Sequence, residues 1–237
     1  MPTRKWTIVV LIGIIVTNCL NEPEKNETRS FVFPLEIGNK WTYEIKWTLD
    51  DSLVDSAYCI SQITGSATSQ DGYSVYEMRD STDSTAWNEY YQEMNDGLYL
   101  FASEAGGIHA LWKKDMSQQA DLRNPPVLLV PYQFSVGEDW VYDTLTDSLN
   151  SHIELLKRRY IGMEKVVSSA GVFECFKFES GGYAGEKRYH YYADKTGLVK
   201  KEEIIDSFGI TGLNPDSGSI EIVAYKKSIR TFILVSY

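Results

Sequence analysis

One run of nine residues shows the period of two that a β-strand imposes on its side chains. From Trp41 to Leu49 every odd position is apolar or aromatic and every even position is polar. Successive side chains of a strand point to opposite faces of its sheet, so this run would bury one face and leave the other in water. The sequence therefore predicts a half-buried strand here, which needs partner strands beside it.

The landmarks around this strand recur later in the chain. The pattern Gly38-x-x-Trp41-x-Tyr43 returns as Gly137-x-x-Trp140-x-Tyr142. Further pairs follow in the same order: 58–64 with 152–161, 72–77 with 171–176, 90–98 with 191–198, and 110–114 with 223–227. Landmarks kept in one order indicate that one hairpin-rich unit is used twice.

Turn-forming residues separate the predicted strands of each unit. Gly97 and Gly197 close tight turns between two strand-like runs, since glycine supplies the positive φ that such turns require. The run 152–165 contains good helix formers, but its counterpart in the first unit is not helical, so we expect a strand. The second unit carries a longer excursion, 206–219, which we place on the surface. The tail 228–237 has no counterpart, and we expect it to complete the sheet.

These patterns predict an all-β fold. Sixteen Tyr and six Trp favour a pleated, half-buried surface. About ten antiparallel strands give a twisted sheet that must curl or close. We expect a curved half-barrel or barrel-like antiparallel sheet built from two tandem repeats, with two packed sandwiches as the alternative. The expected divisions are 1–18 as a signal peptide, 19–30 as a polar tether, 31–114 as the first β repeat, 115–127 as a linker ended by prolines, and 128–237 as the second β repeat with a C-terminal strand.

The first residues carry the pattern of an export signal. Arg4 and Lys5 precede an apolar run over 6–16, which is too short for a comfortable membrane span and suits the apolar region of a signal peptide. Residues 20–30 are polar and charged, as in a solvated tether between an anchor and a folded body. We therefore expect residues 1–18 to be removed on export.

The residues around Cys19 resemble the lipobox of bacterial lipoproteins. Val16 is the aliphatic residue three positions before the cysteine, Thr17 is the small residue, and Asn18 stands where the pattern prefers Gly, Ala or Ser. The resemblance implies that Cys19 carries lipid chains that anchor the mature protein to a membrane. It implies a place in the bacterial cell envelope, periplasmic or on the outer face. Plain secretion and an uncleaved anchor helix are the alternatives.

The expected architecture resembles that of the periplasmic lipoprotein carriers and sorting factors, whose open half-barrel holds acyl chains. This likeness is one of architecture, so the function it implies is an analogy. The opening Pro34 to Tyr43, and the Tyr-Tyr hairpins that end at Gly97 and Gly197, also resemble uncharacterised exported β-proteins of bacteria. The carrier likeness implies an apolar ligand in the β concavity. Its partners would be the membrane, through the anchor, and a lipid or another envelope protein.

The aromatic residues are the candidate binding residues. We predict that Trp47, Trp87, Tyr90 and Tyr191 face a ligand in the concavity, because a concave aromatic face can hold an acyl chain, a glycan or a peptide. The alternative is that these rings only pack the core and form cross-strand pairs.

The sequence disfavours several classes of function. A formal charge of -10 argues against nucleic acid as a partner, because binding phosphates needs clustered Lys and Arg. His109, His152 and His190 lie far apart and lack the spacing of metal ligands, so we expect no metal and no other cofactor. The catalytic patterns of serine hydrolases and zinc proteases do not occur, so we predict no catalytic residue and no enzyme activity.

Two functions remain open on these grounds. The first is a lipid-anchored binding or carrier protein with an apolar concavity. The second is an envelope scaffold that binds another protein along a sheet edge or the excursion 206–219. A hydrolase is the third function and has the least support.

Cys59 and Cys175 would meet an oxidising compartment after export, where they could pair or stay as buried thiols.

Overall fold

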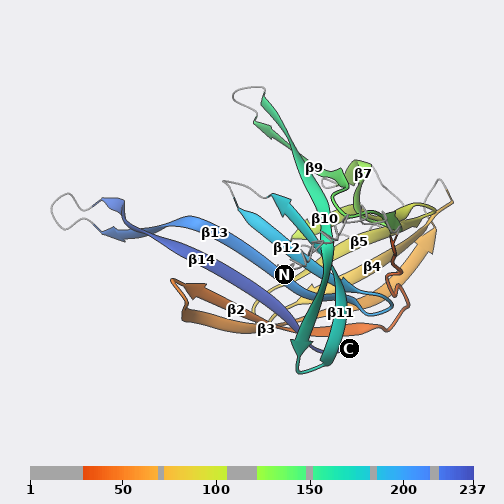
Figure 1. Cartoon of the computed structure of the whole chain (residues 1–237), viewed down its shortest axis with the longest axis horizontal. Helices are drawn as coiled ribbons and strands as arrows, with labels where there is room; N and C mark the ends of the chain where they lie inside the picture. The colour runs from red at the N-terminus through yellow and green to blue at the C-terminus, as the bar shows by residue number, and fades with distance from the viewer. Residues whose placement is uncertain (1–28, 69–71, 106–121, 148–151, 182–185, 214–218) are drawn as a thin grey trace, which may run out of the picture.

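A computed structural model describes residues 29–68, 72–105, 122–147, 152–181, 186–213 and 219–237 (Figure 1). The strands are β1 (Arg29–Ser30), β2 (Lys40–Leu49), β3 (Ser52–Thr68), β4 (Ser74–Ser81), β5 (Ala86–Met94), β6 (Gly97–Ala105), β7 (Leu122–Pro131), β8 (Gln133–Phe134), β9 (Asp139–Asp147), β10 (His152–Ser168), β11 (Gly171–Gly181), β12 (Lys187–Ala193), β13 (Gly197–Leu213) and β14 (Ile220–Ser236). These residues contain no helix, so the all-β prediction is confirmed.

Twelve of these strands form one antiparallel sheet, in the order β7-β6-β5-β4-β3-β2-β14-β13-β12-β11-β10-β9. Each half of this order is a meander, β2 to β7 and β9 to β14, in which every sheet strand pairs with the next along the chain. Strands β2 and β14 pair side by side, with Ile45 opposite Phe232, and join the two meanders. The single continuous sheet is therefore confirmed, and two packed sandwiches are excluded.

The two meanders correspond strand by strand, as a duplicated unit would. Trp41 is the second residue of β2, and Trp140 is the second residue of β9, the first strand of the other meander. Strand order does not measure whether the halves superimpose, so the tandem repeat stays a prediction. The signal peptide, Cys19, most of the tether and the landmark 110–114 lie outside the described residues.

The sheet curls until its two edge strands approach each other. The indole of Trp140 in β9 donates a hydrogen bond to the carbonyl of Leu128 in β7 at 3.1 Å. The guanidinium of Arg158 in β10 donates to the carbonyl of Leu129 at 2.7 Å. Side chains rather than a β ladder bridge this seam within the described part of the chain. The result is a nearly closed barrel. Of the two predicted shapes, a half-barrel and a barrel-like sheet, the structure has the second.

The segment expected to be a linker differs from the prediction. Residues 122–127 of the expected linker 115–127 belong to β7, which pairs with β6 and so extends the first meander. Pro125 and Pro126 fall where the ladder between β6 and β7 is irregular, opposite the stretch between Leu100 and Ala102. An edge strand tolerates proline because the N–H groups on its outer side have no ladder to join.

The excursion 206–219 lies within the hairpin of β13 and β14, and much of it is strand. Residues 208–213 of β13 pair with 220–226 of β14, so the hairpin is a long two-stranded ribbon that extends beyond the barrel in Figure 1. Gly209 lies inside the ribbon, and a Cβ there would come within 3.2 Å of Ile222. Glycine at this position permits close packing rather than a turn.

As expected, β10 is a strand, and the tail in β14 completes the sheet between β13 and β2.

Segments outside the large sheet fill part of the barrel. Strand β1 pairs with β8, and Phe31 and Phe33 just after β1 are 1% and 8% exposed. The ring of Phe31 packs against Phe176 and Tyr192 on the inner face of the second meander, and Phe134 of β8 also packs against Phe176. The concave face is therefore occupied on this side, and the remaining space lies beside the first meander.

Candidate functional site

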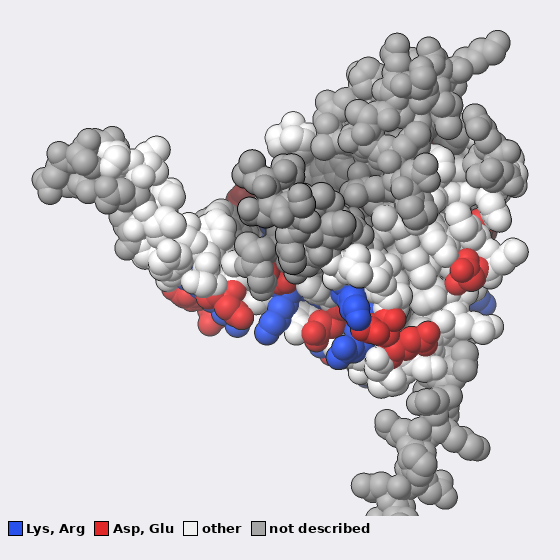
Figure 2. All heavy atoms as spheres, turned by 90° about the horizontal axis from the view of Figure 1, so that it is seen from above, with Lys and Arg blue, Asp and Glu red and all other residues white. Residues whose placement is uncertain are grey.

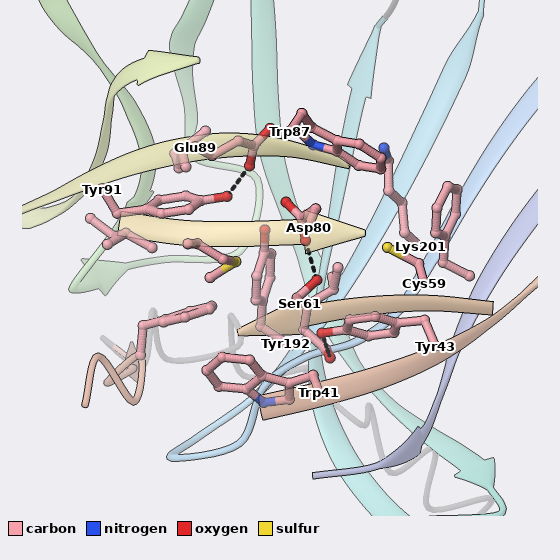
Figure 3. Close-up of a pocket in the computed structure, with 16 residues that line it drawn as sticks. Trp41, Tyr43, Cys59, Ser61, Asp80, Trp87, Glu89, Tyr91, Tyr192 and Lys201 are labelled. Atoms are coloured by element: carbon pink, nitrogen blue, oxygen red, sulfur yellow. Dashed lines mark hydrogen bonds between the residues drawn. The ribbon is translucent and has the colours of Figure 1, made fainter. Parts of the chain in front are cut away.

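A cavity of about 170 Å³ lies inside the barrel beside the first meander. Figure 3 shows side chains from β2, β3, β4 and β5 converging on it, together with side chains from the second meander. Its aromatic walls are Phe33, Trp41, Tyr43, Trp87, Tyr91, Tyr192 and Phe232, and its polar groups include Ser61, Asp80, Glu89 and Lys201. No histidine occurs among the described residues that line it.

The register of the strands brings these residues together. Trp41 lies opposite Ser61, Ser61 opposite Asp80, and Asp80 opposite Trp87, in a row across β2 to β5. Directly opposite residues of paired strands point to the same face of the sheet. Glu89 and Tyr91 follow Trp87 at intervals of two along β5, so they share its inward face.

Asp80 is a buried acid, only 7% exposed. The Ser61 hydroxyl donates a hydrogen bond to its carboxylate. Burial raises the pKa of Asp80 to about 7, the Glu89 carboxylate adds to this rise, and the Ser61 hydrogen bond and Lys201 oppose it. The side chain of Asp80 therefore changes charge close to neutral pH.

Glu89 supplies a second carboxylate to the cavity. The Tyr91 hydroxyl donates a hydrogen bond to its Oε2 atom. Burial, followed by the Glu89 charge, raises the pKa of Tyr91 well above its ordinary value, so this hydroxyl stays protonated. Tyr91 can therefore orient Glu89 without neutralising its charge.

Lys201 is a cation on the cavity wall, but its charge is already paired. Its Nζ atom lies 2.6 Å from Glu203 and 5.1 Å from the centre of the Phe232 ring. Neither Asp80 nor Glu89 forms an ion pair with any residue that the structure describes. Aromatic ring faces are also electronegative, so the cavity favours a positively charged guest.

The outer surface has a different charge pattern from the cavity. On the face in Figure 2, acidic and basic side chains are interspersed and form no broad patch of one sign. Ion pairs such as Lys177 with Glu164, at 2.7 Å, and Lys200 with Glu202, at 2.9 Å, offset charge across and along the strands.

The structure places one of the four predicted ligand-facing aromatics, Trp87, on the cavity wall. Trp47 does not line the cavity, and its indole donates a hydrogen bond to Ser228 at 2.9 Å. Tyr90 is buried in a separate small cluster. Tyr191 also lies outside the cavity, where its hydroxyl donates to Glu202 at 2.9 Å.

Tyr91 and Tyr192, the other members of the two Tyr-Tyr pairs, line the cavity instead. Adjacent residues of a strand face opposite sides, so only one member of each pair can point inward. In β5 the sequence alone could have placed Tyr91 on the same face as Trp87, because an even number of positions separates them. Tyr90 lies an odd number of positions from Trp87 and so faces the other side. The burial of Asp80 could not be predicted in this way, since no local sequence pattern distinguishes a buried acid in a strand from an exposed one.

Cys59 and Cys175 are buried free thiols rather than a disulfide. Cys59 in β3 contributes to the cavity wall, and Cys175 lies in β11. Burial raises the pKa of Cys59 to about 11 and that of Cys175 to about 12. Both thiols therefore stay protonated near neutral pH, which makes them poor nucleophiles and poor metal ligands.

The described residues contain no group of three or more His, Cys, Asp or Glu side chains placed to hold a metal ion. Over the same ranges, no helix has the length and apolar character needed to cross a membrane.

Comparisons with known proteins give two distant likenesses in structure. No protein-family model and no curated protein matches the sequence. The chain is similar to a candidate exported protein with a YmcC-like fold from Bacteroides fragilis, with 14% identity, a TM-score of 0.37, and 87% of this chain and 98% of that chain covered. It is also similar to a candidate lipoprotein from Parabacteroides distasonis, with 13% identity, a TM-score of 0.40, and coverages of 88% and 98%. TM-scores below 0.5 are too low for either likeness to support an assignment.

Proposed function

We propose that this chain is an exported cell-envelope protein, anchored through a lipid on Cys19, whose cavity binds a small organic cation. One observation carries the ligand class: Asp80 and Glu89 lie among aromatic rings without an ion-pair partner in the described part of the chain. The support for export and anchoring is the lipobox-like sequence that ends at Cys19. The proposed role is that of a binding protein without enzyme activity or cofactor.

The volume of the cavity limits the size of the ligand. A protein cavity of about 150 Å³ holds one benzene molecule, so about 170 Å³ suits a compact ammonium group with a short apolar body. Phe31, Phe33 and Phe134 also occupy part of the concave face where an acyl chain would have to lie. A compact cation therefore fits this interior better than the acyl chain that the carrier resemblance implies.

Charge and aromatic surface would act together on such a ligand. A desolvated cation over an aromatic face gains about 2 kcal/mol, and Trp41, Trp87 and Tyr91 present rings to the cavity. A bound cation also favours the ionised form of Asp80, whose pKa burial raises to about 7. Binding should therefore be tighter at pH 8 than at pH 5, where Asp80 is protonated.

Calorimetric titration of the purified protein with tetramethylammonium tests the ligand class. We use tert-butanol as an uncharged molecule of similar size. We expect saturable binding of tetramethylammonium alone, weakened about tenfold by Asp80→Asn and by Trp87→Ala, since each removes more than about 1 kcal/mol of attraction. Trp47→Ala, an aromatic outside the cavity, is the matched control. Equal binding of tert-butanol, or an equal loss in Trp47→Ala, contradicts the proposal.

The anchor is tested separately, so its failure leaves the ligand proposal standing. In cells fed an alkyne fatty acid, the wild-type protein should take up the label and Cys19→Ala should not. Cys59→Ala removes a buried thiol and should keep the label. Label that persists in Cys19→Ala would contradict the proposal that Cys19 carries the lipid.

A second candidate function is favoured by apolar side chains on the β13–β14 hairpin. Ile220, Ile222 and Tyr225 are 77%, 54% and 65% exposed, and this hairpin extends beyond the barrel (Figure 1). Exposed apolar patches mark protein contacts, so an envelope partner could bind here. A photo-crosslinker at Tyr225 should then capture one partner in cells, and a crosslinker at the equally exposed Val167 should not. The same yield from both positions would exclude this function.

A further inference from the structure

A row of polar side chains crosses β10, β11 and β12 outside the cavity. Arg158 lies opposite Ser180, and Ser180 lies opposite Arg188. Neighbouring strands are about 4.8 Å apart and opposite residues share a face, so the two arginines flank the serine. His190 lies two residues further along β12, on the same face. None of these four residues lines the cavity described above.

Several polar atoms of this row are buried without a partner. Arg158, Ser180 and His190 are 4%, 2% and 7% exposed. The Nε atoms of Arg158 and Arg188, the Oγ atom of Ser180 and the Nδ1 atom of His190 make no hydrogen bond to any described residue. Buried polar groups in folded proteins are almost always paired, so a cluster of unpaired ones indicates a place for an external partner.

Arg158 also has no counter-ion among the residues that the structure describes. No described carboxylate lies within 4.0 Å of its guanidinium, whose central carbon is 4.7 Å from the centre of the Tyr142 ring. Burial lowers the pKa of Arg158, and the charge of Arg188 adds to this effect. A buried charge without a partner destabilises the folded state, and an anion beside it would relieve that cost.

The nearby acids are already paired with other cations. Glu186 lies 2.5 Å from Arg188. Glu203, which lies opposite Arg188 in β13, is 2.6 Å from Lys201. The positive charge of Arg158 therefore remains uncompensated by the described residues around it.

The seam between β7 and β9 gives Arg158 a structural role, but this role leaves much of the row unexplained. Its hydrogen bond to the Leu129 carbonyl uses one of its five N–H donors. This bond does not need a second arginine or a serine beside it. A structural role for Arg158 alone does not account for the Ser180 hydroxyl or the Nε atom of Arg188.

We propose that Arg158, Ser180 and Arg188 form a binding site for a small soluble oxyanion, a phosphate, sulfate or carboxylate group. Two planar guanidiniums with a hydroxyl between them match the several acceptor oxygens of such a group. The Arg188 side chain is 24% exposed, so the anion enters from its end of the row. The depth of Arg158 and Ser180 excludes the flat surface of a membrane. This site does not depend on the cation proposed for the cavity.

Calorimetric titration of the purified protein with sodium phosphate, and separately with sodium sulfate, tests the site. Sodium chloride keeps the ionic strength constant. We expect saturable binding and a thermal midpoint that rises with the concentration of the anion. Both anions also stabilise folded proteins by exclusion from their surface, but exclusion gives no saturable heat of binding.

Two variants and one control identify the residues involved. Arg188→Gln alters the partly exposed end of the row, so it should fold, and it should weaken phosphate binding about 10- to 150-fold, the range for one charged hydrogen bond. Ser180→Ala should weaken phosphate binding by a smaller factor. If Arg188→Gln does not fold, Ser180→Ala tests the proposed site. Arg159→Gln removes the same charge from an exposed position beside Arg158 and should bind as the wild type does. No saturable binding by the wild type, or an equal loss in Arg159→Gln, overturns the proposal.

Discussion

Replacing Asp80 by asparagine should change how the stability of this protein depends on pH. Burial raises the pKa of Asp80 from 3.8 to about 7 in the folded state, and unfolding returns it to its ordinary value. Between these two values the folded state binds more protons than the unfolded state. The free energy of unfolding therefore falls as the pH rises above 3.8, and the loss is nearly complete above the folded pKa.

The size of this effect follows from the two pKa values. A carboxyl with a pKa of 3.8 unfolded and about 7 folded lowers the free energy of unfolding by about 2.6 kcal/mol between pH 5 and pH 8. Asparagine keeps the shape of the side chain and can still accept the hydrogen bond from Ser61, but it carries no charge. The stability of Asp80→Asn relative to the wild type should therefore rise by about 2 to 3 kcal/mol over this range.

Urea unfolding of both proteins at pH 5, 6, 7 and 8 measures this difference. Comparing the two proteins at each pH cancels the titration of all other groups. Asp83→Asn, at an exposed position just beyond β4, is the matched control and should run parallel to the wild type. A parallel curve for Asp80→Asn as well would refute the conclusion that Asp80 is a desolvated acid in the folded state.

Two further predictions use the same unfolding measurement. Burial, followed by Arg158, lowers the pKa of His190 well below 6.5, so only the unfolded state gains this proton below pH 6.5. The free energy of unfolding of the wild type should then fall on acidification, with a slope approaching about 1.4 kcal/mol per pH unit. His190→Gln should lack this contribution. The same slope in His190→Gln as in the wild type would contradict the prediction. A Cβ on Gly97 would lie 2.7 Å from Val130 O and from Leu128 Cδ1, so Gly97→Ala should cost about 1 to 3 kcal/mol. Gly65→Ala has open space and should cost nothing, and equal costs would refute this steric account.

Much of the fold could be predicted because strand formation leaves a local pattern. The alternation from Trp41 to Leu49 is β2, and the glycines at 97 and 197 each begin the returning strand of a hairpin. Gly197 has the predicted positive φ, 88°, but Gly97 does not, so the prediction of its backbone conformation was wrong. The turn between β2 and β3 was not predicted in detail. Asp50 and Asp51 there have φ of 47° and 64°, which suits the two-residue turn that matches the twist of a hairpin. Aspartate adopts this conformation more readily than most residues, so two acids in sequence mark a turn here.

The errors came from features that depend on distant partners. Pro125 and Pro126 would end a central strand, but β7 tolerates them because it lies at the sheet edge, and a strand's place in the sheet is not a local property. The strand pairing within the excursion 206–219 was not predicted. Its residues pair in a ribbon because 208–213 and 220–226 support each other.

The sequence by itself determined the strands, their hairpins and the curved antiparallel class, because side-chain alternation and turn chemistry are written in neighbouring residues. Only the tertiary structure decided which strand faces enclose the cavity, where Tyr91 and Tyr192 lie rather than Tyr90 and Tyr191. It alone brought Asp80 beside Glu89, and Arg158 beside Ser180. The reason is that a shift of one residue in register exchanges the two faces of a strand, and register is set by partners far away in the chain.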